Sequence, residues 1–269
     1  MKKDMKKIIG RSLQMAMEIM YDAERQTYTN WINELLASLK SSSLRGLKVW
    51  FPVKNVSDVD NWIQFAVCKK VRMLKLYFGR AIDYVLPLEL FKVERFDSLC
   101  VLRMKSISVT EEMLEYLLCT CLLLETLSLV DSEVSKTMKV LVSGSSLKLE
   151  CLELVRCLEL TKVEIFAEKL VSFKYYGPNL ETEFKIVSSL VEASFGGSFM
   201  EFVRESFMLQ IKVLKLDVNS FEVSVKVLIS SERTRLLVSA ENEYAIIVSP
   251  SQHGKYIVVF DLLDGFSNI

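Results

Sequence analysis

The feature that most constrains the fold is a spaced apolar pattern, L-x-x-L-x-L with conservative apolar replacements, which recurs along most of the 269-residue chain. Its eight copies begin at Leu44, Val71, Leu99, Leu124, Leu149, Leu170, Leu190 and Ile211. The last two apolar positions of each copy are two residues apart, so their side chains point to one face of a short strand. One copy cannot bury such a face alone, which predicts that the copies stack.

Stacked copies of this kind form a continuous parallel sheet over a shared core. The interval between copies lies within the period of about 20–29 residues that is typical of leucine-rich repeats. We therefore predict an α/β fold, a leucine-rich-repeat solenoid in the form of an irregular horseshoe. Its parallel sheet should be concave, and helices or turns should cover the convex side. The alternative is that the pattern arises by chance, because leucine is common.

The segments between the copies should supply the outer layer of the fold. Asp58–Lys69 and Glu111–Cys121 each place apolar residues on one helical stripe, which predicts two amphipathic helices. Val134–Val142 and Val223–Ile229 are shorter versions of the same pattern.

Three domains are predicted from where the repeat starts and stops. Residues 1–43 should form a helical lead-in or cap, 44–231 a repeat domain of about eight units, and 232–269 a C-terminal capping segment. The capping segment has two apolar runs, Tyr244–Val248 and Tyr256–Leu263, separated by a Ser-Pro-Ser-Gln-His-Gly break that favours a turn between two strands. A capping segment of β structure is therefore expected.

The N-terminus predicts an amphipathic helix, because its apolar residues recur at helical spacing. They are Met5, Ile8, Ile9, Leu13, Met17 and Met20. Polar residues interrupt the stretch, which argues against a signal peptide, and a membrane-surface role for its lysines is the alternative. Six cysteines sit in apolar runs without C-x-x-C spacing, as expected for reduced core thiols. We expect an intracellular protein, cytoplasmic or nuclear or both, with no transmembrane helix.

Composition and motifs both argue against an enzyme. The chain has one histidine, nine glycines and four prolines, which leaves little material for histidine-based catalysis or phosphate-binding loops. No G-x-G-x-x-G, G-x-x-x-x-G-K-[ST], H-E-x-x-H or G-x-S-x-G motif occurs. With 34 basic and 34 acidic residues the net charge is zero, which disfavours nucleic acid as a partner. We therefore expect no catalytic residues, no metal and no cofactor.

One surface of the expected sheet suggests binding. The residue between the last two apolar positions of each copy should face solvent, and five of these eight residues are basic. With the aromatic residues nearby, the candidate binding face comprises Lys48, Trp50, Lys75, Tyr77, Arg103, Lys105, Lys174, Tyr176 and Lys215. An acidic peptide or another anionic ligand would suit it, with the aromatic rings as anchors. The alternative is that exposed strands carry lysine for solubility.

Four stretches carry a family resemblance, and the first is Trp31-Ile32-Asn33 followed by Leu35-Leu36. Val59-Asp60-Asn61-Trp62-Ile63 with Ala66 is similar to a V-D-x-W-I-x-x-A helix, and Tyr84-Val85-Leu86-Pro87 with Leu90-Phe91 is similar to Y-x-L-P-x-x-L-F. Leu122–Leu129 is similar to C-P-x-L-E-x-L-x-L, with Leu122 where proline is usual. Over about residues 28–216 the chain therefore resembles the plant F-box/leucine-rich-repeat proteins, which include FBD-type members.

The resemblance implies a non-enzymatic protein-binding module, like the substrate-recognition half of an SCF-type ubiquitin ligase. Met1–Thr27 contains no proline and no F-box signature, and no FBD-type extension is recognisable in 232–269. The expected partner is a protein substrate on the concave face, with a Skp–cullin complex only if an F-box is supplied elsewhere. The alternatives are a truncated or decoy repeat protein without a ligase role, a scaffold for an anionic ligand, and an unrecognised hydrolase or transferase.

Overall fold

The structure, a computed structural model, describes most of the chain up to Gly197 and four shorter stretches beyond it. The described residues are 2–53, 55–79, 83–92, 95–134, 136–141, 147–178, 180–197, 211–217, 234–239, 246–247 and 256–260.

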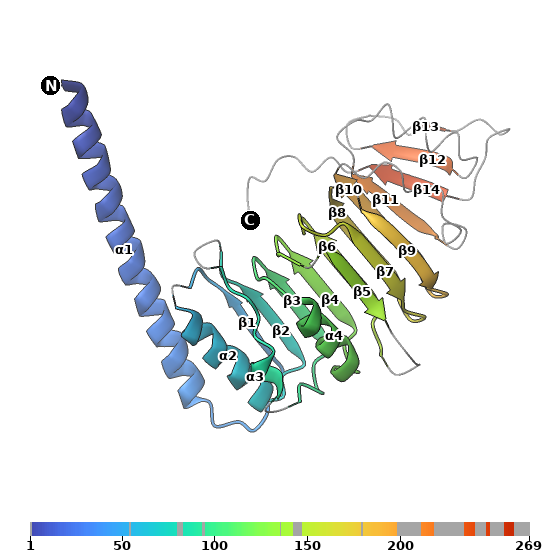
Figure 1. Ribbon diagram of the computed structural model, residues 1–269, viewed down its shortest axis with the longest axis horizontal. Coiled ribbons are helices and arrows are strands. Elements are labelled where there is room, and N and C mark those ends of the chain that lie inside the picture. Colours follow the sequence, from blue (N-terminus) through green and yellow to red (C-terminus); the bar gives the residue numbers. More distant parts are fainter. Residues whose placement is uncertain are drawn as a thin grey trace.

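Most of the described strands belong to one long sheet (Figure 1). Its order is β1-β2-β3-β4-β6-β8-β10-β11-β14-β12-β13, and every pair is parallel except β12 with β13. The bounds are β1 Gly46–Trp50, β2 Met73–Tyr77, β3 Val101–Lys105, β4 Thr126–Val130, β6 Cys151–Val155, β8 Ser172–Gly177, β10 Glu192–Gly197, β11 Val213–Asp217, β12 Thr234–Ser239, β13 Ile246–Ile247 and β14 Tyr256–Phe260. The eight L-x-x-L-x-L stretches lie at the eight strands from β1 to β11 in this order.

Helices α2, α3 and α4 cover one face of the first half of the sheet, whereas most of α1 projects away from it (Figure 1). The helices are α1 Lys2–Ser38, α2 Val56–Cys68, α3 Glu89–Lys92 and α4 Glu111–Thr120. The helices predicted over Asp58–Lys69 and Glu111–Cys121 are thus confirmed as α2 and α4. The Thr110 side chain caps α4 by accepting a hydrogen bond from the backbone N–H of Met113, at 3.2 Å.

A second, three-stranded parallel sheet replaces the helices beside the later part of the long sheet. Its strands are β5 Thr137–Leu141, β7 Lys162–Phe166 and β9 Glu181–Ile186. Phe173 of β8 packs edge-to-face on Phe184 of β9, with ring centroids 5.3 Å apart. Because Phe173 is in register with Leu152 and the other core-facing leucines, the second sheet lies on the same face as the helices.

The core runs along the molecule between these layers. Leucines of the long sheet meet the apolar stripe of α2, where Trp62 is 1% exposed, and the stripe of α4. Further along, Phe173 also packs on Phe195 of β10 at 5.8 Å. Burial of alternate strand residues and of one stripe per helix is the packing that the apolar spacing requires.

The expected leucine-rich-repeat solenoid, an irregular horseshoe with helices or turns on its convex side, is wrong as a description of the whole chain. From Thr137 onward the face of the long sheet that helices cover near its start is covered by strands β5, β7 and β9, not by helices or turns. Strand β14 lies between β11 and β12, so the end of the sheet breaks the sequential order that stacked repeats produce.

Two smaller expectations concern the same region. Val134–Val142 was expected to be a short helix and instead contains β5, while Val223–Ile229 lies outside the described residues. The expected turn over 249–254 also lies outside them, and the domain boundaries at 43 and 231 stay a prediction. Within the part of the chain that the structure describes, no helix combines the length and the apolar character needed to span a membrane.

A ladder of ion pairs on the second sheet predicts a pH effect on stability. Lys162 Nζ lies 2.9 Å from a carboxylate oxygen of Glu183 and 3.1 Å from one of Glu181, and Lys185 Nζ lies 2.9 Å from the other oxygen of Glu183. The hydrogen bond from Lys162 has the largest effect and the one from Lys185 the next largest, and together they lower the pKa of Glu183 to about 2.

A carboxylate whose pKa is lowered by folding stabilises the protein above its unfolded-state pKa, and this stabilisation is lost as the pH falls through the folded pKa. We expect Glu183→Gln to lower the melting temperature at pH 7, and the difference from the original chain to shrink as the pH falls from about 4.5 towards about 2. Melting curves across this range, with Glu168→Gln as an exposed control, measure it. A difference that is the same at every pH would contradict the role of Glu183.

Candidate functional site

The structure aligns the predicted binding face in rows on the side of the sheet opposite the helices. Strand register places one row across eight strands: Lys48, Lys75, Arg103, Ser128, Glu153, Lys174, Ser194 and Lys215. A second row, two residues further on, contains Trp50, Tyr77, Lys105 and Tyr176. The nine candidate residues thus share one face, and binding of an acidic or protein partner to it stays a prediction.

Acidic side chains on the same face neutralise part of this basic row. Lys174 Nζ lies 3.0 Å from Glu153, and Lys215 Nζ lies 2.6 Å from Glu192. Burial alone would raise the pKa of Glu153, but hydrogen bonds from Ser128 and Lys174 outweigh burial and lower it. Glu192 belongs to a neighbouring row, so the sequence pattern that selected the lysines could not show this pairing.

Two further lysines of this face, Lys48 and Lys105, make cation–π contacts with aromatic rings. Trp50 and Tyr77 pack edge-to-face with centroids 5.7 Å apart, Lys48 Nζ lies 4.9 Å from the Trp50 ring, and Lys105 Nζ lies 4.7 Å from the Tyr77 ring. Lys105 Nζ is also 3.9 Å from Asp131. These contacts hold the aromatic residues and lysines against one another at the start of the sheet.

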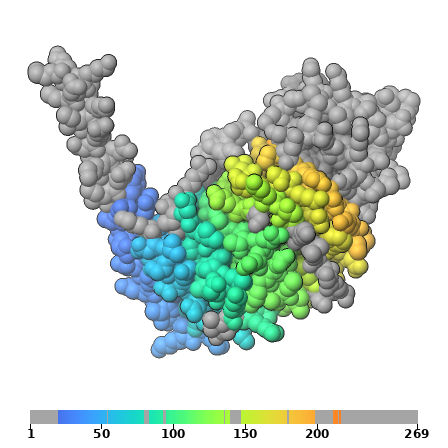
Figure 2. Space-filling view, in the orientation of Figure 1, coloured from blue at the N-terminus to red at the C-terminus, as the bar shows by residue number. Residues whose placement is uncertain are grey.

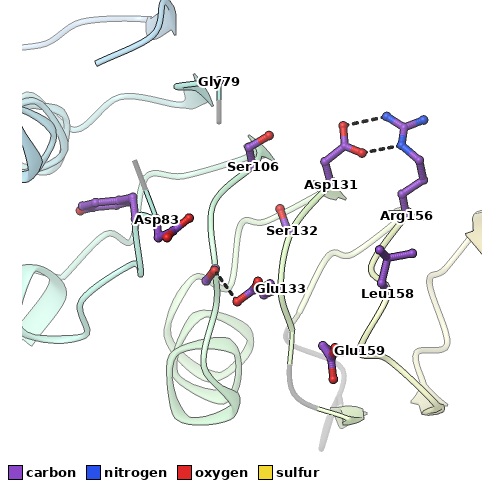
Figure 3. A pocket seen from close by; sticks show the side chains of 11 residues that line it. Gly79, Asp83, Ser106, Asp131, Ser132, Glu133, Arg156, Leu158 and Glu159 are labelled. Carbon is purple, nitrogen blue, oxygen red and sulfur yellow. Dashed lines mark hydrogen bonds and ion pairs between the residues drawn. The ribbon is translucent and has the colours of Figure 1, made fainter. Parts of the chain in front are cut away.

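A pocket of about 360 Å³ lies beyond the carboxyl ends of β2, β3, β4 and β6 (Figure 3). Ser106, Asp131 and Arg156 each follow a strand directly, and each has a positive φ, of 58°, 49° and 53°. The same left-handed turn therefore ends three neighbouring strands, and it brings their polar side chains to one rim. Clefts at the carboxyl ends of parallel strands are frequent ligand sites in open α/β sheets.

The charges of this pocket do not suit an anionic ligand. Asp131 and Arg156 face one another and form a two-pronged ion pair, with Arg156 Nη2 donating to Asp131 Oδ2 at 2.7 Å (Figure 3). The hydrogen bond to Asp131 raises the pKa of Arg156 further. Asp83, Glu133 and Glu159 add three carboxylates to the lining, so negative charge outweighs the one guanidinium. Among the described residues, no three His, Cys, Asp or Glu side chains are grouped to hold a metal ion.

Two family models match different parts of the chain. Residues 177–269 match the N-terminal domain of fructose-1,6-bisphosphatase, and residues 89–194 match the leucine-rich-repeat domain of At1g61320/AtMIF1. The chain is thus similar to a plant leucine-rich-repeat domain in its middle and to a phosphatase domain in its last third. No solved structure matches the chain.

Individual relatives agree with the phosphatase match. The chain is 67% identical over 55 residues to the cytosolic fructose-1,6-bisphosphatase of Musa acuminata and 66% identical over 55 residues to that of Beta vulgaris. It is 59% identical over 58 residues to fructose-1,6-bisphosphatase 1 of Bos taurus. These segments cover 20–22% of this chain and 16–17% of the relatives, so the chain spans about a sixth of the length of the curated relatives it matches.

These similarities correct the expected function, and the match over 177–269 also contradicts the expected repeat solenoid as the fold of the whole chain. A non-enzymatic module for substrate recognition in a ubiquitin ligase is contradicted, because the matched relatives are enzymes named as phosphatases. The resemblance to plant leucine-rich-repeat proteins holds for 89–194, but the matched domain is not an F-box.

The similarity of the last third is not apparent from the repeat pattern, because that pattern ends before residue 232. Asp261 and Asp264 were the available signal, since two carboxylates and then a glycine follow the apolar strand β14 directly in the sequence. Polar side chains after the carboxyl end of a parallel strand are candidates for ligand binding or catalysis.

Proposed function

We propose that the chain is a phosphatase related in function to the fructose-1,6-bisphosphatases, and that it hydrolyses a phosphate ester of a sugar. The observation that carries this proposal is the identity of 59–67% over 55–58 residues with enzymes of that name. The family match over 177–269 supports it. Because the matched segment is about a sixth of the length of those enzymes, both the activity and the substrate of this chain are part of the proposal.

The candidate acid groups are the carboxylates of Asp261 and Asp264. Strand β14, which precedes them, pairs in parallel with β11 on one side and with β12 on the other. A central strand of a parallel sheet is a rigid support, and its carboxyl end is where such sheets present reactive groups. The acidic pocket at Asp131 and Arg156 is the competing location, disfavoured by its charge.

Phosphate release tests this proposal. We expect the chain to release inorganic phosphate from fructose 1,6-bisphosphate faster than from fructose 6-phosphate. Asp261→Asn and Asp264→Asn should each lower the rate at least about tenfold, the scale of removing an acid–base or charged group from a reaction site. Glu159→Gln, in the pocket, is the matched control and should leave the rate unchanged. Equal rates for all four proteins would contradict the proposal.

We also infer an intracellular location. All six cysteines are reduced thiols, and burial raises the pKa of Cys121 to about 11 and of Cys157 to about 12. The relatives named cytosolic support the same location.

A common ancestry of residues 89–194 with the repeat region of plant F-box/leucine-rich-repeat proteins is likewise a proposal, supported by the match over those residues, and no ligase role is attached to it.

A further inference from the structure

Helix α1 is far longer than its contacts with the rest of the protein require. Its 37 residues extend about 55 Å at the usual rise per residue. Its C-terminal part is anchored, since Thr29 and Leu36 are buried and Asn33 accepts a hydrogen bond from Trp62 Nε1 at 2.7 Å. The helix then runs away from the sheet, and its N-terminal end lies far from the body of the molecule (Figure 1).

The sequence of the projecting part gives this helix an apolar seam. Met20 and Tyr21 are 65% and 54% exposed. In the sequence before them, apolar residues recur every three or four positions from Met5 to Met17. Helices that lack tertiary packing are marginal in water, because propensity alone rarely offsets the cost of nucleation. A partner that covers this seam would stabilise it.

Charge along the helix indicates which partner fits. The first part is basic and carries Lys2, Lys3, Lys6, Lys7 and Arg11 against Asp4. The following part is acidic and carries Glu18, Asp22 and Glu24. Two such helices side by side in parallel would bring like charges together, whereas antiparallel pairing places each basic part against the acidic part of the other helix.

We propose that α1 is a self-association element, and that residues 2–24 of two copies pair antiparallel through the apolar seam. The arrangement is a two-fold symmetric contact, in which the same surface of each copy is used. It also suits the shape of the chain, because the bodies join α1 at its C-terminal end and so lie at opposite ends of the pair (Figure 1).

Sedimentation equilibrium of the full chain tests this pairing. We expect a monomer–dimer equilibrium, and we expect Lys6→Glu with Lys7→Glu to weaken it at least about tenfold, because attractions on both sides of the pair become repulsions. The compensating variant, which adds Glu18→Lys and Glu24→Lys, should restore dimerisation, which separates lost pairing from lost folding.

Three results would overturn the proposal. The chain is a monomer at every concentration tested, the charge reversal leaves the dimer unchanged, or the compensating variant fails to restore it. Binding of a monomeric chain to vesicles that contain phosphatidylserine, lost on the lysine reversal, would assign the basic helix to a membrane surface instead.

Discussion

Replacing Trp62 by alanine is expected to lower the free energy of unfolding by about 3–5 kcal/mol. Its side chain is 1% exposed in the core between α2 and the sheet, and its ring centroid lies 6.5 Å from that of Phe78. The indole N–H also donates to Asn33 of α1 at 2.7 Å, so one side chain both fills the core and ties α1 to the body. The alanine variant loses both the core packing and the hydrogen bond to Asn33.

Urea unfolding at equilibrium measures this loss. Trp62→Phe is the matched control, since it keeps most of the buried ring and removes the hydrogen bond, and we expect it to cost about 1–2 kcal/mol. A loss below about 1.5 kcal/mol for Trp62→Ala, with an unchanged dependence on urea, would contradict the placement of this residue in the core.

Replacing Gly197 by alanine is the second change with a large expected effect, a loss of about 2–4 kcal/mol. Gly197 ends β10 opposite Gly177 of β8 and has a φ of +87°. An alanine Cβ there would lie 2.3 Å from the Gly177 carbonyl oxygen. Because the obstacle is backbone, the two strands must separate, and the strained φ adds to the cost.

Gly46→Ala is the control for this substitution. Its Cβ would lie 3.1 Å from the Met73 side chain and carbonyl oxygen, and its φ lies outside the left-handed region. We expect a loss under about 1 kcal/mol, because a displacement of a few tenths of an ångström relieves both contacts. Equal losses for the two glycine variants in thermal or urea unfolding would show that the close approach of β8 and β10 at Gly177 is absent.

Local patterns in the sequence predicted the local structure well. The stripe around Trp62 and Ile63 predicts α2, and the alternation Leu74-Lys75-Leu76 predicts a strand with one buried and one open face, because each depends on a period within a few residues. Val134–Val142 was misjudged, since an apolar run this short fits one helical turn as well as a strand such as β5.

Long-range features were not predictable in the same way. The insertion of β14 between β11 and β12 joins segments about 20 and 40 residues apart in the chain, and no local spacing encodes it. The pairing of Lys215 with Glu192 depends on strand register across two repeats. The phosphatase similarity of the last third is a match of residue identities, which a search for apolar periods and short motifs does not detect.

The most direct test of the proposed function compares phosphate release from fructose 1,6-bisphosphate by the full chain and by residues 1–197, purified side by side. Circular dichroism of both proteins reports whether the shorter one is folded. Phosphate-ester hydrolysis by the last third predicts release by the full chain and none by residues 1–197. Equal release by the two proteins, or none by either, would contradict the account.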